Sequence, residues 1–467
     1  MPATFTESFG RFARSPGFKF FLVLLLVLLL MIPLGLIWFL VSERESRAYT
    51  VKEEVAGQWG RAQHISGPYL IVPYTVKVMV PQPDNKLVET QQERRAVFLP
   101  DSLNINGDAK TEVRHRAIYD VTVYGAKLTL EGRFASPDIN LADADVTSVR
   151  WRDAILAVGI SDVSGLTEGA TLTIEGGPGI PFEPSIGLAN STSVGIHARI
   201  APSQAADQPT AAFTFRFNLA LNGSTTLNFA PVARETRVTL ASNWPHPSFA
   251  GAFLPESRDI RPDGFTASWR VPHLARSVPQ VWSLGGPAAH YSLDRFSPYQ
   301  FGTNFYVPID YYDLVNRAAK YGLMFLAIAF MAVLVLELTS GKRVHAVQYV
   351  LVGLSMILFY ALLLSFSEHI GFPLAYLMAS VATGGMLSVY VGYALSSRVK
   401  GLIMLCVFLI LYGLLYLILR LEDYALLAGA VAGFVMLTVT MFATLRVNWS
   451  GDDERAPAYG GRQQPAE

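Results

Sequence analysis

Long apolar runs occur at two places in the chain, one near its start and a group in its last third. The first is uncharged from Phe20 to Val41, and about 20 apolar residues are enough to cross the hydrocarbon core of a bilayer. Short loops separate the later runs, which cover 321–338, 346–366, 372–395, 401–419 and 424–445. One such run can be a buried core helix, but five in close succession indicate a membrane bundle. The pattern predicts six transmembrane helices.

Between these groups, residues 42–317 show a period of two that is typical of strands with one buried face. Apolar side chains alternate with polar ones from Tyr119 to Phe134 and from Phe213 to Leu221, and Asn106-Gly107 and Asn222-Gly223 are hairpin signals. We expect a large, mainly-β antiparallel, sandwich-like domain. A division into two β units within 201–210 stays open as an alternative.

The segment from Ser242 to Pro255 interrupts this alternation with several prolines, which cannot donate to a β ladder. It reads as an apolar loop containing Trp244 and His246. One interpretation is a binding lip or a membrane-touching loop, for which Trp244 and His246 are the candidate functional residues. The interpretation that we favour is a loop packed onto the sandwich.

Basic residues in the short segments predict the topology, because cytoplasmic loops are rich in Lys and Arg. They occur before the first run and in two of the loops: Arg11, Arg14, Lys19, Lys342, Arg343, Arg398 and Lys400. The predicted organisation is a cytoplasmic N-terminus (1–19), a first helix (20–41), a periplasmic β domain (42–317), a five-helix bundle (318–445) and a disordered cytoplasmic tail (446–467). Both termini are then cytoplasmic in a bacterial inner membrane.

Composition adds few functional clues. Hydrophobic residues make up 51% of the chain and charged residues 16%, and the formal net charge is +0, so no basic face for nucleic acid is expected. One cysteine excludes an internal disulfide, and no two histidines have the spacing of metal ligands. No nucleotide-binding or nucleophile motif is found. We therefore assign no catalytic residue, cofactor or metal, and expect a protein that is not an enzyme.

Three ionisable residues at the ends of spans are candidate functional residues, because charge in lipid is costly. Glu337 lies at the inner end of the second span, and Glu368 and His369 lie at the outer end of the third. Glu368 and His369 form either a proton or substrate site or, as we favour, a water-facing loop between helices. For Glu337 we favour a carboxylate that either snorkels to the interface or is paired near Lys342 or Arg343.

Small residues recur at intervals of four in two spans. Ser380, Gly384, Ser388 and Gly392 lie in the fourth predicted span, 372–395, and Gly429 and Gly433 lie in the sixth, 424–445. This spacing places small side chains on one helix face and permits close helix packing. We expect packing within the bundle, with the seam of a homo-oligomer as the alternative.

Several segments in a fixed order carry a family resemblance. They are Gly67-Pro68-Tyr69, the loop Ser242-Asn243-Trp244-Pro245-His246-Pro247-Ser248-Phe249, the run Arg317-Ala318-Ala319-Lys320-Tyr321-Gly322, the run from His345 to Ser355, and Ser367-Glu368-His369-Ile370-Gly371-Phe372. With these segments the chain resembles the CreD family of bacterial inner-membrane proteins over nearly its whole length. Ala346 stands where the family typically has proline.

The resemblance implies a cell-envelope integrity protein, linked to the Cre two-component regulon, colicin tolerance and envelope stress. It implies no catalytic residue, cofactor or ligand. Our first hypothesis is a non-catalytic sensor or scaffold whose partners, besides the lipid bilayer, are an envelope lipid, a peptidoglycan fragment or another envelope protein. The second is a transport or export component, and the third is a membrane enzyme with an interfacial site at Glu368 and His369.

Overall fold

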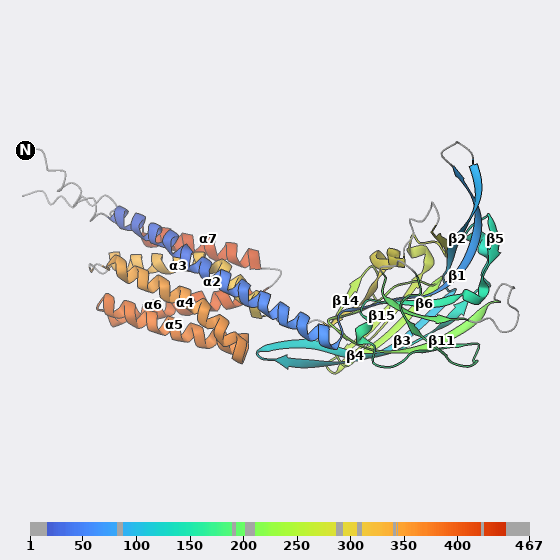
Figure 1. Ribbon diagram of the computed structural model, residues 1–467. Coiled ribbons are helices and arrows are strands. Elements are labelled where there is room, and N and C mark those ends of the chain that lie inside the picture. Colours follow the sequence, from blue (N-terminus) through green and yellow to red (C-terminus); the bar gives the residue numbers. More distant parts are fainter. Residues whose placement is uncertain are drawn as a thin grey trace, which may run out of the picture. The chain divides into compact units, whose positions relative to one another are not determined.

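The computed structural model describes residues 16–81, 87–188, 193–200, 211–285, 293–305, 311–339, 342, 344–421 and 425–444. The chain forms two compact units (Figure 1). One is helical and comprises Met1–Arg47 with Ile309–Glu467, and the other is the β domain, Ala48–Pro308. The boundaries predicted from the sequence, 42 and 317, differ from those of this unit, 48 and 308.

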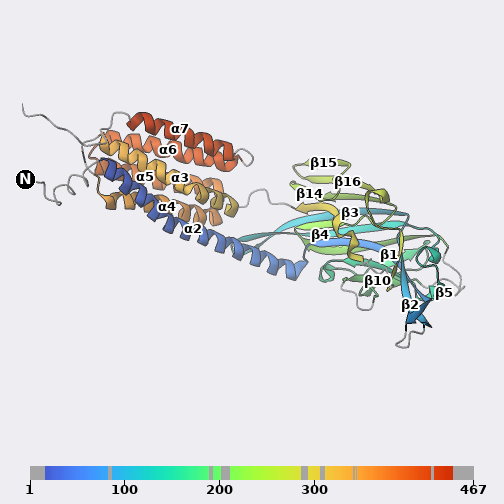
Figure 2. The same ribbon diagram turned by 90° about the horizontal axis from the view of Figure 1, so that it is seen from above.

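Apolar helices build the helical unit. Those in the part of the chain that the structure describes are α2 (Pro16–Trp59), α3 (Tyr311–Leu338), α4 (Ala346–Ile370), α5 (Phe372–Ala394), α6 (Arg398–Arg420) and α7 (Ala425–Thr444). The last turns of α2 belong to the β domain. Helix α7 packs beside α3 and α6, as Figure 2 shows.

The number of membrane spans differs from the prediction. Among the described residues, five helices are long and apolar enough to cross a membrane, namely α2, α3, α4, α5 and α6. The sixth predicted span, 424–445, coincides with α7, where the apolar helical stretch found is Gly429–Val439, shorter than the roughly 20 residues that a span needs. The prediction of six spans is therefore wrong in its count, because only the stretch Gly429–Val439 of the sixth apolar run is found as an apolar helix among the described residues.

Several helices continue beyond the apolar runs that predicted them. Helix α3 begins at Tyr311, and α4 continues through Ile370. Helix α2 runs without a break to Trp59, well beyond the apolar run that ends at Val41. Helical hydrogen bonds continue into polar sequence as readily as in apolar sequence, whereas hydropathy detects only the apolar part.

Two sheets form the β domain. In the described residues the first sheet has ten strands: β1 (Gln63–Pro81), β2 (Leu87–Phe98), β5 (Val146–Val149), β6 (Ile155–Ile160), β9 (Glu183–Pro184), β10 (Gly195–Arg199), β12 (Thr226–Phe229), β14 (Pro247–Gly251), β17 (Val281–Leu284) and β18 (Phe301–Phe305). Its main path is β14-β18-β12-β1-β6-β10-β9, with β2, β5 and β17 attached beside it.

The second sheet has eight strands within the same described ranges: β3 (Ser102–Arg116), β4 (Tyr119–Phe134), β7 (Thr171–Ile174), β8 (Ile180–Pro181), β11 (Phe213–Ser224), β13 (Glu235–Ser242), β15 (Ser257–Arg261) and β16 (Gly264–Pro272). Its order is β15-β16-β13-β3-β4-β11-β7-β8. Short 3-10 helices connect strands: η1 (Ile139–Leu141), η2 (Trp151–Asp153), η3 (Val163–Gly165), η4 (His273–Ala275) and η5 (Leu293–Tyr299).

Both sheets are mixed, which corrects the expected antiparallel sandwich. Strand β1 pairs in parallel with β12, and β13 pairs in parallel with β3. The remaining pairs between described strands are antiparallel. A parallel pair needs a long crossover connection instead of a tight hairpin, so a local strand pattern does not reveal it.

A continuous apolar core fills the space between the sheets. In β11, alternate residues from Phe213 to Leu221 are buried, as their period predicts. Aromatic rings join the two layers: Tyr124 of β4 lies 4.8 Å from Phe305 of β18, and Trp269 of β16 lies 5.8 Å from Phe301.

The two Asn-Gly signals do not form the expected hairpins. Asn106 and Gly107 lie inside β3, where a Cβ on Gly107 would be 2.9 Å from Leu128 and 3.0 Å from Leu240. This glycine therefore permits close packing against β4 and β13. Gly223 lies near the end of β11, which leads through Thr225 to β12 of the other sheet. The proposed division within 201–210 lies outside the described residues.

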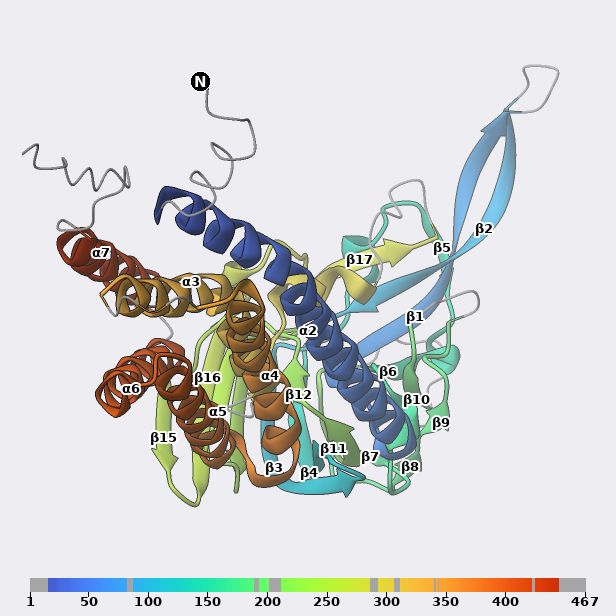
Figure 3. The same ribbon diagram turned by 90° about the vertical axis from the view of Figure 1, so that its left-hand side faces the viewer.

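The hairpin of β1 and β2 extends beyond the body of the β domain (Figure 3). Its strands stay paired as far as Pro81 and Leu87. Met79 and Leu87 near its end are exposed.

Candidate functional sites

Glu337 is a buried carboxylate in the last turn of α3, only 3% exposed. Its Oε1 accepts a hydrogen bond from the backbone N–H of Val344 (2.9 Å) and pairs with the ammonium group of Lys19. Its Oε2 accepts from the hydroxyl of Tyr349 (3.0 Å). The ion pair is made by Lys19 of α2, which we did not consider as a partner from the sequence. The loop that we considered contributes the backbone N–H of Val344, and Arg343 lies outside the described residues.

Glu368 is half-buried as a residue, but its side chain is only 6% exposed. The hydroxyl of Tyr312 donates to its Oε1 (3.0 Å), and Nη1 of Arg44 lies 3.9 Å from its Oε2. This corrects the expectation of a water-facing loop, because α4 continues through this position and turns the carboxylate toward α2 and α3. His369 is exposed, and its Nδ1 donates to the carbonyl of Ser365 (2.9 Å).

Glu368 and His369 do not form a dyad. Adjacent residues on a helix point in directions about 100° apart, and here one is buried and the other exposed. The carboxylate instead acts as an acceptor for Tyr312 and as a counter-charge for Arg44.

The two buried carboxylates repeat one arrangement at opposite ends of the α3–α4 pair. At one end the glutamate comes from α3 and the tyrosine, Tyr349, from α4. At the other end the glutamate comes from α4 and the tyrosine, Tyr312, from α3. In both cases the cation comes from α2, on either side of its apolar run. The contact of Lys19 is the more buried of the two, since the Arg44 side chain is 41% exposed. A buried ion pair is costly to break, whereas an exposed one contributes little.

The small residues of α5 face α6 for most of their length. A Cβ on Gly384 would lie 3.5 Å from Phe408 and Tyr412, and a Cβ on Gly392 would lie 3.1 Å from the Cα of Gly401. Ser388 is buried and donates to the carbonyl of Gly384 (2.6 Å). Ser380 is half-buried and donates to the carbonyl of Leu377 (3.0 Å).

The small residues of α7 face α3. A Cβ on Gly429 would lie 3.5 Å from the ring of Tyr321, and one on Gly433 would lie 3.9 Å from Sδ of Met324. Both glycines therefore allow α7 to lie close to α3.

The Trp-Pro-His-Pro segment lies against the β domain. Trp244 is half-buried on the apolar core, and its Nε1 donates to the carbonyl of His246 (3.1 Å), whose own side chain is exposed. Beyond it, Phe249 makes edge contacts with Phe265 and Trp269. The expectation that prolines exclude a ladder here is wrong in part, because Pro247 begins edge strand β14, which pairs with β18. Proline is tolerated at the start of an edge strand.

The end of α2 docks onto the hairpin of β3 and β4. Trp59 donates from Nε1 to the carbonyl of Tyr124 (3.2 Å), and the guanidinium of Arg114 lies 3.7 Å above the Trp59 ring. Arg116 pairs with Glu54 at 3.1 Å. A hydrogen bond, a cation–π contact and an ion pair thus hold the last two turns of the helix.

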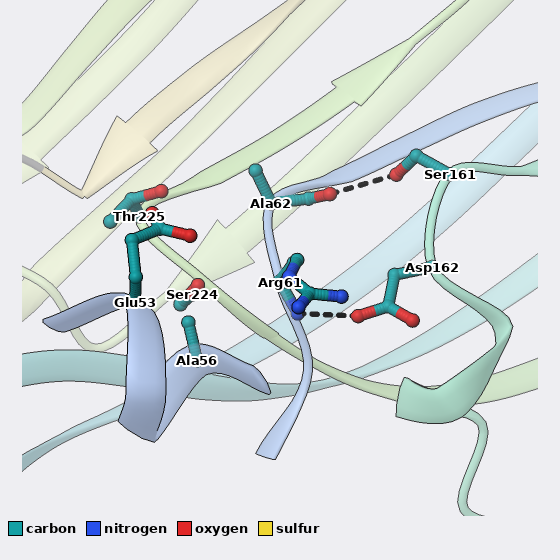
Figure 4. A pocket seen from close by; sticks show the side chains of 8 residues that line it. All are labelled: Glu53, Ala56, Arg61, Ala62, Ser161, Asp162, Ser224 and Thr225. Carbon is teal, nitrogen blue, oxygen red and sulfur yellow. Dashed lines mark hydrogen bonds between the residues drawn. The ribbon is translucent and has the colours of Figure 1, made fainter. Parts of the chain in front are cut away.

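A polar pocket of about 340 Å³ lies beside this joint (Figure 4). Eight residues line it, from α2, the segment between α2 and β1, the segment that follows β6, and the junction of β11 and β12: Glu53, Ala56, Arg61, Ala62, Ser161, Asp162, Ser224 and Thr225. Both signs of charge and several hydroxyl groups are present, which suits a polar ligand.

Asp162 is the best-defined charge of this pocket. Burial by itself raises the pKa of its carboxyl group, but hydrogen bonds from Ser164 and from the backbone N–H of Arg61 (2.8 Å) outweigh burial and lower the pKa. Its carboxylate is therefore ionised at neutral pH.

Sequence reasoning missed Lys19, Arg44, Tyr312 and Tyr349 as partners of the glutamates, and it missed the whole pocket. The only signal for the cations was their position flanking the first apolar run. The pocket residues are scattered over more than 150 positions without a motif. Across the described ranges, no group of three or more His, Cys, Asp and Glu side chains is placed to hold a metal ion.

Comparison with known proteins agrees with the resemblance found in the sequence. The family model described as "Inner membrane protein CreD" matches residues 15–450. The chain is 31% identical over 427 residues to Inner membrane protein CreD of Escherichia coli (strain K12), covering 91% of each protein. Together with the five helices of spanning length and composition found among the described residues, these matches show that the chain is a multi-pass inner membrane protein that belongs to the CreD family.

Proposed function

We propose that this protein supports cell-envelope integrity as a non-enzymatic scaffold or sensor, with a role in envelope stress and colicin tolerance. The observation that carries the proposal is the continuous core between the two sheets of the β domain. Phe217, Trp269 and Phe301 belong to the side chains that fill it. A filled core supports a rigid domain that braces or senses, and it disfavours the passage of a lipid between the sheets.

The sensor role has a place for a ligand in the polar pocket. Glu53 and Ala56 of α2 form one wall, and Arg61 and Asp162 supply opposite charges. A polar envelope molecule such as a peptidoglycan fragment fits this chemistry. Its binding would act directly on the last turns of α2.

The proposed topology places the N-terminus in the cytoplasm and the β domain in the periplasm. Its support is the bias of Lys and Arg toward the N-terminus and the loops at 339–345 and 396–400. Alkaline phosphatase is active only in the periplasm. Fusions of it within 396–400, within 421–424 or after residue 446 would therefore report on which side of the membrane each of these positions lies.

The main test uses a strain that lacks the gene, complemented with the full chain. We expect the deletion to increase sensitivity to detergent and to change colicin tolerance, and the chain to restore both. Absence of a phenotype, or failure of a normally abundant chain to rescue it, would contradict the envelope role.

Photolabelling separates the scaffold from the transport component. Membranes containing the chain are supplied with a phospholipid that carries a diazirine on its acyl chain, and labelled peptides are mapped. A scaffold predicts label only in the apolar helices. Label in core strands such as β6 and β11 would favour transport through the β domain.

One pair of variants tests the sensor role. Glu53→Lys reverses a charge that lines the pocket, and Glu43→Lys makes the same change at an exposed position of α2 outside it. A sensor predicts loss of rescue for Glu53→Lys alone, at normal abundance. Equal rescue by both variants would contradict a sensor role of the pocket and would leave the scaffold role alone.

A further inference from the structure

A groove of about 500 Å³ runs along the outer face of the helical unit between α5 and α6. Aromatic, aliphatic and glycine residues line it: Pro373, Tyr376, Leu377, Ser380, Val381, Gly384, Gly385, Leu405, Phe408, Leu409, Tyr412, Gly413 and Tyr416. Leu377, Val381 and Leu409 at its rim are exposed. In a protein of the inner membrane, such a surface faces lipid.

The groove has a clear structural cause. At one end, α5 and α6 meet through their backbones, since a Cβ on Gly392 would be 3.1 Å from the Cα of Gly401. Toward the other end, large rings separate them, with Tyr376 5.1 Å from Tyr416 and its hydroxyl bonded to the carbonyl of Tyr412 (2.6 Å). The two helices therefore diverge and leave a furrow between them.

Two glycines keep the furrow open. A Cβ on either Gly385 or Gly413 would meet nothing within 4 Å. One turn to each side on the same outward faces, the residues are large: Val381 and Val389 on α5, and Leu409 and Leu417 on α6, all exposed. A second helix packs best against small residues repeated at every turn. A single notch flanked by large side chains fits a flexible acyl chain better.

A cation lies at the tyrosine end of the groove. Arg420 donates from Nε (3.3 Å) and Nη2 (3.1 Å) to the hydroxyl of Tyr416, and its guanidinium lies 5.5 Å from the Tyr416 ring. Arg420 is exposed. A guanidinium has five N–H donors in a planar fork, so it can bind a phosphate while it still contacts the tyrosine.

We propose that this groove is a binding site for one membrane phospholipid. One acyl chain lies in the notch at Gly385 and Gly413, and the phosphate binds Arg420. Anionic phospholipids bind best, because Arg420 adds an attraction that a zwitterionic headgroup partly cancels. The site requires only the inner-membrane location and does not depend on the scaffold role.

Native mass spectrometry of the delipidated full chain tests the site, with phosphatidylglycerol, phosphatidylethanolamine and diacylglycerol as probes. We expect one phosphatidylglycerol to be retained in preference to the other two. Gly413→Leu fills the notch and should lower its occupancy several-fold. Arg420→Gln should weaken the binding of phosphatidylglycerol about fivefold. This change corresponds to the attraction of about 1 kcal/mol that one basic residue near a membrane surface contributes.

Gly35→Leu is the matched control, because Gly35 of α2 is also exposed and a Cβ there would meet nothing within 4 Å. It should retain lipid as the unchanged protein does, and circular dichroism should show all variants folded. Equal retention by Gly413→Leu and Gly35→Leu would overturn the proposal. So would a fall in oligomeric mass for Gly413→Leu with lipid unchanged, since the groove would then join two copies. Binding of diacylglycerol equal to that of phosphatidylglycerol would overturn the role of Arg420.

Discussion

Lys19 and Glu337, separated by 318 residues in the sequence, form an ion pair that joins the start of α2 to the end of α3. Arg44, beyond the apolar run of the same helix, faces Glu368 at the end of α4. The apolar part of α2 is thus held between two charge contacts. Each carboxylate also accepts a tyrosine hydroxyl from the neighbouring helix, which fixes its orientation.

Removing the carboxylate of Glu337 should destabilise the helical unit. In Glu337→Ala, Lys19 loses its counter-charge and Tyr349 loses its acceptor, and breaking a buried pair costs about 3–5 kcal/mol. Thermal unfolding of the purified chain in detergent would show a lowered Tm. The double variant Lys19→Met with Glu337→Leu should recover much of the loss, because no charge is left unpaired. A double variant as unstable as Glu337→Ala would argue against the ion pair as the cause.

Changes at Glu368 and His369 should have unequal effects. Glu368→Ala leaves the buried hydroxyl of Tyr312 without its acceptor, which costs about 1–3 kcal/mol. Glu368→Gln keeps an acceptor oxygen and should cost less, and His369→Asn at an exposed position should have almost no effect on stability. Membrane abundance and Tm measure all three.

The same variants decide whether this end of α4 is a working site. Loss of detergent resistance in Glu368→Gln at normal abundance would revive the transport and enzyme hypotheses. Full rescue would leave Glu368 with the structural role that its contacts indicate.

Asp162 should make stability depend on pH. Because hydrogen bonds from Ser164 and Arg61 lower its pKa in the folded protein, its carboxylate stabilises the fold above the unfolded value of about 3.9. This contribution is lost as pH falls through the folded pKa. Asp162→Asn should therefore lower Tm at neutral pH. The difference from the unchanged protein should shrink once pH falls below about 4, and a constant difference would contradict the assignment.

Gly60 should be essential to the joint between α2 and β1. Its φ is +145°, and a Cβ there would lie 2.5 Å from the carbonyl oxygen of Asn222. Gly60→Ala should cost at least about 1–3 kcal/mol from backbone strain, before the clash is counted. Gly57→Ala is the matched control three residues earlier, where the nearest atom is 3.5 Å away in the Arg61 side chain. Alanine favours a helix by about 1 kcal/mol over glycine, so the control should be neutral or stabilising in a Tm measurement.

Local patterns predicted many elements well. The alternation from Tyr119 to Phe134 gives the bounds of β4, and that beginning at Phe213 gives the start of β11. The apolar runs likewise predicted the central parts of α2 to α6. A strand with one buried face must alternate apolar and polar residues, and a helix in an apolar environment must be apolar throughout, so both patterns are visible in neighbouring residues.

Asn106-Gly107 shows where local reasoning fails. As a dipeptide it is a strong turn signal, yet it lies within a strand that pairs with β4 on one side and in parallel with β13 on the other. Residues 235–242, far along the chain, supply that second partner. No short-range pattern contains this information.

The sequence by itself determined the apolar helices, the alternating strands and the membership of the CreD family, because each is written in neighbouring residues or in motifs in a fixed order. Only the tertiary structure decided which strands run in parallel, which cation faces each buried carboxylate, and how α2 meets the β domain beside a polar pocket. These features depend on contacts between residues that lie tens to hundreds of positions apart, such as Lys19 with Glu337. Such contacts are selected by the packing of the whole chain and leave no periodic trace in it.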